Sequence, residues 1–180
     1  MKIKGDFVTN SSSTGFILMF KGNNKIRFYQ NLVEHADKFK LTYDRSWSNN
    51  SELIHCDVWD IIEAIDPLIR KDEGPDRDIW IMKGIEPIEI IQKRYNDELS
   101  YIKEELKKDD TWYTEEELQE SINNVDKVER AISKGFTHYY DIDAGNDGNI
   151  SGNLGDILDY AGRYLDIDDD TLILITEQRR

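Results

Sequence analysis

The chain has 180 residues, 38% of them hydrophobic and 11% aromatic, which supplies enough apolar material for a globular core and argues against disorder. Asp and Glu outnumber Lys and Arg by 37 to 23, and the resulting net charge of −14 disfavours direct binding to nucleic-acid phosphates. No apolar run approaches the roughly 18 residues of a membrane-spanning helix. The first residues lack a signal peptide's apolar core and the single cysteine suits a reducing compartment, so we expect a cytoplasmic protein that does not bind membranes.

The N-terminal half predicts short strands and helices in alternation. The continuous apolar run 15–20 is typical of a strand, and residues 25–29 alternate polar and apolar side chains as a second, half-buried strand does. The Gly-Asn stretch between them is typical of a hairpin turn. The later elements expected in this half are a helix at 30–40, a polar loop at 45–51, a helix at 58–65 and a strand at 77–83.

The segment 86–134 predicts a long antiparallel helical hairpin. Two stripes of apolar residues recur at spacings of three and four, which is the period of one helix face. Thr114 followed three residues later by Glu117 is a capping box and predicts the start of the second helix. The stripes consist of Ile88, Ile91, Tyr95, Leu99, Ile102 and Leu106, and of Leu118, Ile122, Val125, Val128 and Ile132.

The C-terminal part predicts two more strands, at 136–142 and 171–176, and a helix between them after a polar loop. Continuous apolarity in 16–20 and 172–175 predicts burial on both strand faces, so we expect these two strands to be neighbours or one strand apart. The fold class is therefore α+β: a single domain over 1–180 with a mixed sheet of about five to six strands, from which the 86–134 hairpin projects.

Residues 6–16, Asp-Phe-Val-Thr-Asn-Ser-Ser-Ser-Thr-Gly-Phe, carry a resemblance to a known group. The segment resembles the N-terminal signature of uncharacterised bacterial, archaeal and phage proteins, in which Phe-Val-Ser/Thr-Asn leads into a serine run and then Phe. The resemblance covers about the first 20 residues and implies lineage but no activity. Here Thr14-Gly15 interrupts what is more often unbroken serine.

The polar run itself has three interpretations. Backbone N–H groups and hydroxyls in such a loop can bind an anion, and the candidate residues are Asn10, Ser11, Ser12, Ser13 and Thr14. The hydroxyls are also candidates for modification. The simplest alternative is a hairpin loop whose hydroxyls bond their own backbone.

A second candidate site lies in the Asp- and Asn-rich segment 141–153. Asp141, Asp143 and Asp147 carry the oxygen ligands that Ca²⁺ or Mg²⁺ prefers. An EF-hand register that starts at Asp143 fails, because Gly145 stands at position 3 and Leu154 at position 12. The alternative, which we favour, is a polar turn followed by a helix cap, with no cofactor.

The absence of a recognisable catalytic motif and the strong negative charge favour a non-enzymatic protein that binds another protein, and we expect an accessory factor of a phage or mobile element. Trp112, Tyr113, Glu115 and Glu116 at the hairpin tip are the candidate interaction residues. The structural alternative, which we favour for this pair, is a staple in which the two aromatic residues pack back on the second helix. The acidic surface suggests a partner with a basic surface, or serves solubility alone. The second functional hypothesis is a divalent-cation-dependent enzyme or ligand-binding protein that uses the 141–153 loop.

Overall fold

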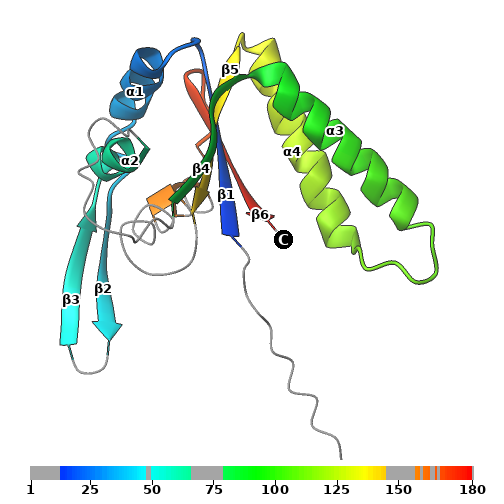
Figure 1. Cartoon of the computed structure of the whole chain (residues 1–180), viewed down its shortest axis with the longest axis horizontal. Coiled ribbons are helices and arrows are strands. Elements are labelled where there is room, and N and C mark those ends of the chain that lie inside the picture. The colour runs from blue at the N-terminus through cyan, green and yellow to red at the C-terminus, as the bar shows by residue number, and fades with distance from the viewer. Residues whose placement is uncertain are drawn as a thin grey trace, which may run out of the picture.

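A four-stranded antiparallel sheet lies at the centre of the molecule, with helices on both of its faces (Figure 1). The strand order is β4-β5-β1-β6. These strands are β1 (Ser13–Phe20), β4 (Ile79–Pro87), β5 (His138–Ala144) and β6 (Leu172–Arg179). The computed structural model describes residues 13–47, 50–65, 79–144, 157–158, 160–162, 165 and 167–179.

Strand β1 is buried on both faces. It pairs with β6 in a register that sets Phe16 opposite Thr176 and Phe20 opposite Leu172. The predicted adjacency of the two continuous apolar strands is thereby confirmed. Even-numbered β1 residues point to one hydrophobic cluster and odd-numbered residues to another, because successive side chains of a strand face opposite sides.

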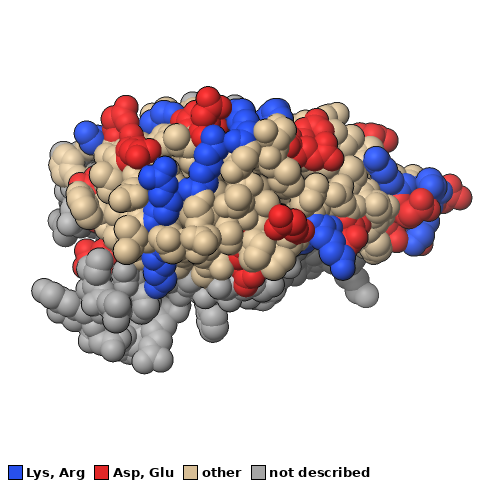
Figure 2. Space-filling model, turned by 90° about the horizontal axis from the view of Figure 1, so that it is seen from above, with Lys and Arg blue, Asp and Glu red and all other residues tan. Residues whose placement is uncertain are grey.

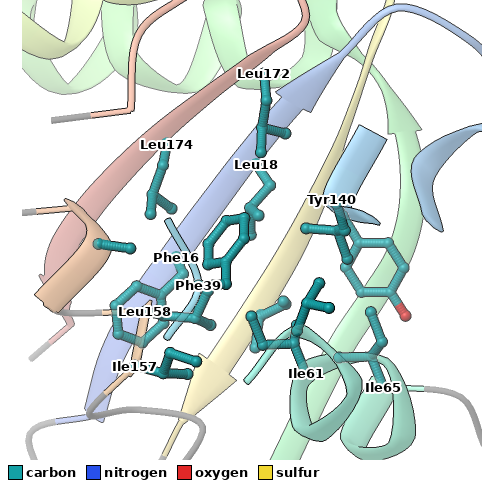
Figure 3. Close-up of a cluster of buried hydrophobic side chains, with 14 of the residues drawn as sticks. Phe16, Leu18, Phe39, Ile61, Ile65, Tyr140, Ile157, Leu158, Leu172 and Leu174 are labelled. Carbon is teal, nitrogen blue, oxygen red and sulfur yellow. The ribbon is translucent and has the colours of Figure 1, made fainter. Parts of the chain in front are cut away.

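The first cluster joins one face of the sheet to helices α1 (Lys25–Glu34) and α2 (Val58–Ile65). Figure 3 shows Ile61 and Ile65 of α2 on the same side of the sheet as Phe16 and Leu18. Helical residues of the segment 157–162 pack on the same face through Ile157, Leu158 and Ala161. The lone cysteine, Cys56, is buried in this cluster too. The aromatic and aliphatic members from the sheet, α1 and α2 include Phe16, Leu18, Phe28, Leu32, Ile61, Ile65, Tyr140 and Leu174.

The strand predicted at 25–29 is wrong, because α1 begins at Lys25. The Asn24 side chain accepts a hydrogen bond from the backbone N–H of Arg27 at 2.9 Å, so Asn24 is a helix N-cap rather than part of a hairpin turn. Phe28 and Leu32 are separated by one helical turn and both face the sheet. The short apolar alternation in 25–29 had fitted either structure.

The opposite face of the sheet is covered by α3 (Ile88–Glu105) and α4 (Glu115–Ser133), which pack against each other (Figure 1). The capping box at the start of α4 is present, with the Thr114 side chain bonded to the Glu117 backbone and the Glu117 carboxylate to the Thr114 backbone. Gly135, at φ +83°, follows the C-terminus of α4 in the left-handed conformation that glycine favours. The second cluster lies between these helices and the sheet, and includes Ile17, Met19, Ile91, Tyr95, Val128 and Ile175.

Strands β2 (Leu41–Trp47) and β3 (Asn50–Cys56) form a separate two-stranded sheet, where a polar loop over 45–51 was predicted. The two strands pair from Leu41 opposite Cys56 to Trp47 opposite Asn50. Their sequences contain many polar residues and lack the continuous apolarity of β1, so they are unsuited to a position between two helical layers.

The α+β class is confirmed, whereas the sheet differs from the expected one. In place of one mixed sheet of five to six strands, the described residues form an antiparallel four-stranded sheet and a two-stranded ribbon. No helix in the described part of the chain is both long and apolar enough to cross a lipid bilayer.

Replacing Ile91 by Ala tests how the second cluster holds α3 to the sheet. Ile91 is fully buried, so we expect a loss of about 2–5 kcal/mol in the free energy of unfolding, measured by chemical denaturation. The exposed Glu116 serves as the control, since Glu116→Gln should change stability by no more than about 0.5 kcal/mol. Equal effects of the two substitutions would contradict this assignment of the buried face.

Candidate functional site

The N-terminal end of β1 lies beside the start of the 141–153 segment. Thr14 is opposite Ala144 of β5 and Gln178 of β6, and Asp143 is opposite Gly15. The acidic turn before β6, by which we mean Asp168, Asp169 and Asp170, lies at the other end of the strand, where Phe20 pairs with Leu172. The sheet therefore brings the described end of the serine run close to the predicted aspartate segment.

Only part of the two predicted ligand sets falls within the described structure. Ser13 and Thr14 begin β1, and Asp141 and Asp143 belong to β5. The remaining candidates, Asn10, Ser11, Ser12 and Asp147, lie outside the described residues.

Asp141 belongs to an arginine–carboxylate cluster, which consists of Arg94, Tyr95, Asp141 and Glu177. Asp141 and Glu177 come from the two strands that flank β1, and Arg94 and Tyr95 come from α3. Arg94 donates through Nη2 to both carboxylate oxygens of Glu177, at 2.9 and 2.6 Å, and its Nη1 lies 3.7 Å from Oδ2 of the buried Asp141. The Tyr95 hydroxyl donates to Glu177 Oε2 at 2.8 Å. One guanidinium thus compensates two carboxylates at the boundary of the second cluster.

Burial also changes the pKa values of two α3 side chains at this cluster, Tyr95 and Glu98. Burial raises the pKa of Tyr95 well above its ordinary value, and the Glu177 carboxylate acts in the same direction. Tyr95 is therefore a neutral hydrogen-bond donor at neutral pH. Burial also raises the pKa of Glu98, on the same helix, and Glu177 adds to that rise.

The carboxylate of Asp141, a predicted metal ligand, is paired with Arg94 in this structure. Within the residues that the structure describes, no three His, Cys, Asp or Glu side chains are grouped so that they could hold a metal ion. The cluster orders α3 against the strands that flank β1, and its two carboxylates share the single positive charge of Arg94.

A second polar cluster joins the end of α1 to the turn before β6. His35 is buried, with Nε2 2.7 Å from Asp169 Oδ2, and the Lys38 ammonium lies 3.0 Å from the same oxygen. The other carboxylate oxygen accepts bonds from the backbone N–H groups of Thr171 and Leu172. Burial alone would raise the pKa of Asp169, but the bonds from Thr171, His35 and Lys38 outweigh it and hold that pKa far below its ordinary value.

The rest of the acidic turn is paired with cations of α4 and its C-terminus. Arg130 donates to Asp168 at 2.5 Å, and Lys134 lies 3.6 Å from Asp168 and 3.5 Å from Asp170. Acidic and basic side chains are interspersed on the face that Figure 2 shows. The acids of this turn therefore stabilise the fold internally and do not form an uncompensated negative surface.

The predicted interaction residues lie at the hairpin tip. We use this name for residues 101–120, which form the end of the α3–α4 pair that lies away from the sheet (Figure 1). Trp112 is 91% exposed, so the expectation that it packs back on α4 as a staple is wrong. Tyr113 instead packs edge-on against Tyr101 of α3, with ring centroids 5.8 Å apart. Glu115 and Glu116 are exposed in the first turn of α4.

The arginine–carboxylate cluster and the His35–Asp169 pair were not anticipated. Glu177 continues the alternation of Ile173 and Ile175, and this two-residue period was the signal that a carboxylate belongs to the second-cluster face of β6. Nothing local links Arg94 to Glu177, because 83 residues separate them. The partner of His35 is more distant still.

Comparison of the chain with protein-family models, with curated proteins and with solved structures finds no match in any of the three. What this protein does is therefore inferred from the geometry of its own side chains.

The lowered pKa of Asp169 predicts acid sensitivity. A carboxyl group whose pKa is lower in the folded than in the unfolded state contributes stability above its unfolded pKa, about 4, and loses that contribution as the pH falls through the interval below it. The Asp169→Asn variant should therefore be less stable than the wild type at pH 7, and the difference should shrink between about pH 4 and pH 2.

Urea denaturation at a series of pH values measures this difference directly. Asp109→Asn, at an exposed position in the hairpin tip, is the matched control and should leave the wild-type profile unchanged. A stability gap between wild type and Asp169→Asn that stays constant with pH would show that the His35–Asp169 contact contributes no such linkage.

Proposed function

We propose that this protein is a cytoplasmic, non-enzymatic protein that acts by binding another protein through the hairpin tip. The observation that carries this proposal is the 91% exposure of Trp112 at the end of a helical pair. The resemblance of residues 6–16 suggests an accessory factor of a phage or mobile element.

An exposed tryptophan in this position is unusual for a residue with no binding role. Indole has the largest apolar surface among side chains, and its burial against a partner removes that surface from water. Tryptophan, tyrosine and arginine are enriched among the residues that dominate binding energy. The same tip carries Tyr101, which is 54% exposed and contacts Tyr113, the residue that follows Trp112 in the chain.

The tip is also held in place before any partner binds. The reciprocal hydrogen bonds between Thr114 and Glu117 fix the N-cap of α4, which is two residues after Trp112. The Tyr113 backbone N–H donates to the Thr111 hydroxyl at 3.1 Å, which constrains the residues on either side of Trp112. A backbone ordered in advance lowers the conformational entropy lost on binding.

The alternative function, a divalent-cation-dependent enzyme or ligand-binding protein, has one observation in its favour. Thr14 is opposite Ala144 in the sheet, so the end of the serine run and the start of the aspartate segment are adjacent. We rank the cation-dependent function second, because the Asp141 carboxylate, one of its predicted ligands, is paired with Arg94. Calorimetric titration with calcium, magnesium, manganese and inorganic phosphate, each to millimolar concentration, tests it.

Replacing Trp112 by Ala should abolish partner binding while the fold stays intact. Removal of a central aromatic residue from an interface typically costs about 2–4 kcal/mol, or roughly a 30- to 1000-fold loss of affinity. The measurement is recovery of a stoichiometric partner from a lysate of the source cell by immobilised protein. Thermal unfolding should show little change, since Trp112 makes few contacts with the rest of the chain.

Trp59 offers a matched control, because it is a second tryptophan that the described residues show exposed, at 62%, and it lies on α2 on the opposite side of the sheet. Trp59→Ala should retain the partner. Equal retention by Trp112→Ala and Trp59→Ala would contradict a role for the hairpin tip, and recovery of no partner even by the wild type at low salt would count against protein binding altogether.

A further inference from the structure

We infer that the partner of the hairpin tip presents an apolar pocket bordered by Lys or Arg side chains, an inference that rests on the proposed function and names the chemistry of its partner. Residues 101–120 contain eight Asp and Glu residues and three Lys residues, which gives this segment a net charge of −5.

Two of the three lysines are already paired within the tip. Lys107 lies 2.6 Å from Glu104 and Lys108 lies 2.5 Å from Glu105. Each contact compensates the charge of one glutamate, Glu104 or Glu105, and neither involves the acids nearest to Trp112 in the sequence.

The acids closest to Trp112 in sequence are exposed on both sides of it. Asp109 and Asp110 precede the tryptophan, and Glu115 and Glu116 follow it in the first turn of α4. The structure gives none of the four an ion pair with another described residue. Each is within four residues of Trp112, so its backbone lies at most about 14 Å away.

This arrangement sets two requirements for whatever binds. The indole needs an apolar surface to leave water, because burial of apolar area is what makes its binding favourable. The surrounding carboxylates oppose any partner of the same sign and favour cationic groups at the border of the contact, where charges set association rate and specificity. A protein pocket with an apolar floor and a basic border satisfies both requirements.

The acidic side chains of the tip disfavour three other kinds of binding partner: nucleic acid, a membrane surface and a second copy of this chain. Nucleic-acid phosphates and the anionic headgroups of a cytoplasmic membrane carry the sign of the tip. A second copy of this chain would bring an identical acidic tip and the same net charge of −14. We therefore assign the tip to a different, basic protein surface.

Site-specific photocrosslinking tests the inference. The photoreactive residue p-benzoylphenylalanine replaces Trp112 in one full-length protein and Trp59 in a control, because its two aromatic rings keep a large apolar side chain at the position. Each protein is irradiated in a lysate of the source cell at low salt. Mass spectrometry then identifies the molecules and peptides joined to each position. We expect a product specific to position 112, with the crosslinked peptide combining apolar residues with Lys or Arg.

Charge-neutral variants of the crosslinking protein provide the second measurement. Glu115→Gln/Glu116→Gln should lower the yield of the position-112 product by roughly five- to thirty-fold, as expected for the loss of two border charges, and high salt should lower it as well. The control is Glu89→Gln/Glu129→Gln, which neutralises two exposed helical acids outside the tip and should leave most of the yield unchanged. Circular dichroism verifies that both double variants are folded.

Failure of the inference and failure of the proposed function give different results. A product specific to position 112 whose yield is insensitive to salt and to the Glu115 and Glu116 changes would overturn the basic border and leave the protein-binding function standing. A product that proves to be a second copy of the chain, a lipid or a nucleic acid would also overturn the inference. No product at position 112 beyond that at position 59 would overturn both.

Discussion

The double-sided burial of β1 is the constraint on which the rest of the structure depends. From Phe16 to Phe20 every side chain is inaccessible to solvent, so each of its faces must be covered by a different layer. Helices α1 and α2 with the 157–162 segment cover one face, and α3 with α4 covers the other. Without either layer, the strand would expose apolar side chains to water.

This constraint also explains where polar groups are placed. The arginine–carboxylate cluster lies where the second cluster ends, and the His35–Asp169 pair lies where the first layer meets the opposite end of β6. In both places a basic side chain from a helix, or from the residues directly after a helix, is bonded to a carboxylate from β6 or the turn before it. The helical layers are thus attached to the sheet by charge-assisted hydrogen bonds at its edges as well as by apolar contact in the middle.

The sequence predicted those parts of the fold whose signals are local or repeated. Continuous apolarity identified β1 and β6 as adjacent buried strands, and Thr114 with Glu117 marked the start of α4. Short segments were ambiguous: residues 25–29 alternate as a strand does, yet the Asn24 cap starts a helix there. Tertiary packing of Phe28 against Tyr140 decides between the two, and no local pattern contains that information.

The candidate sites divide in the same way. Trp112 belongs to a single stretch of chain, so the two helical stripes that flank it predicted its place between the helices, although its exposure was not expected. The arginine–carboxylate cluster instead requires three segments, α3, β5 and β6, to be brought together by the sheet register. Composition and spacing along the chain do not determine such a register, which is why Arg94 and Glu177 were missed while Asp141 was assigned to a different chemistry.

The location of the single cysteine has a practical consequence. Cys56 is buried in the first cluster, at the end of β3 next to α2, and the second cluster contains no thiol. The rate at which a thiol reagent modifies the native protein therefore reports the opening of the face covered by α1 and α2. It does not report the opening of the face covered by α3 and α4. The hairpin tip is attached to the face covered by α3 and α4. Labelling of Cys56 therefore distinguishes opening of the α1 and α2 face from events at the tip, and it requires no engineered cysteine.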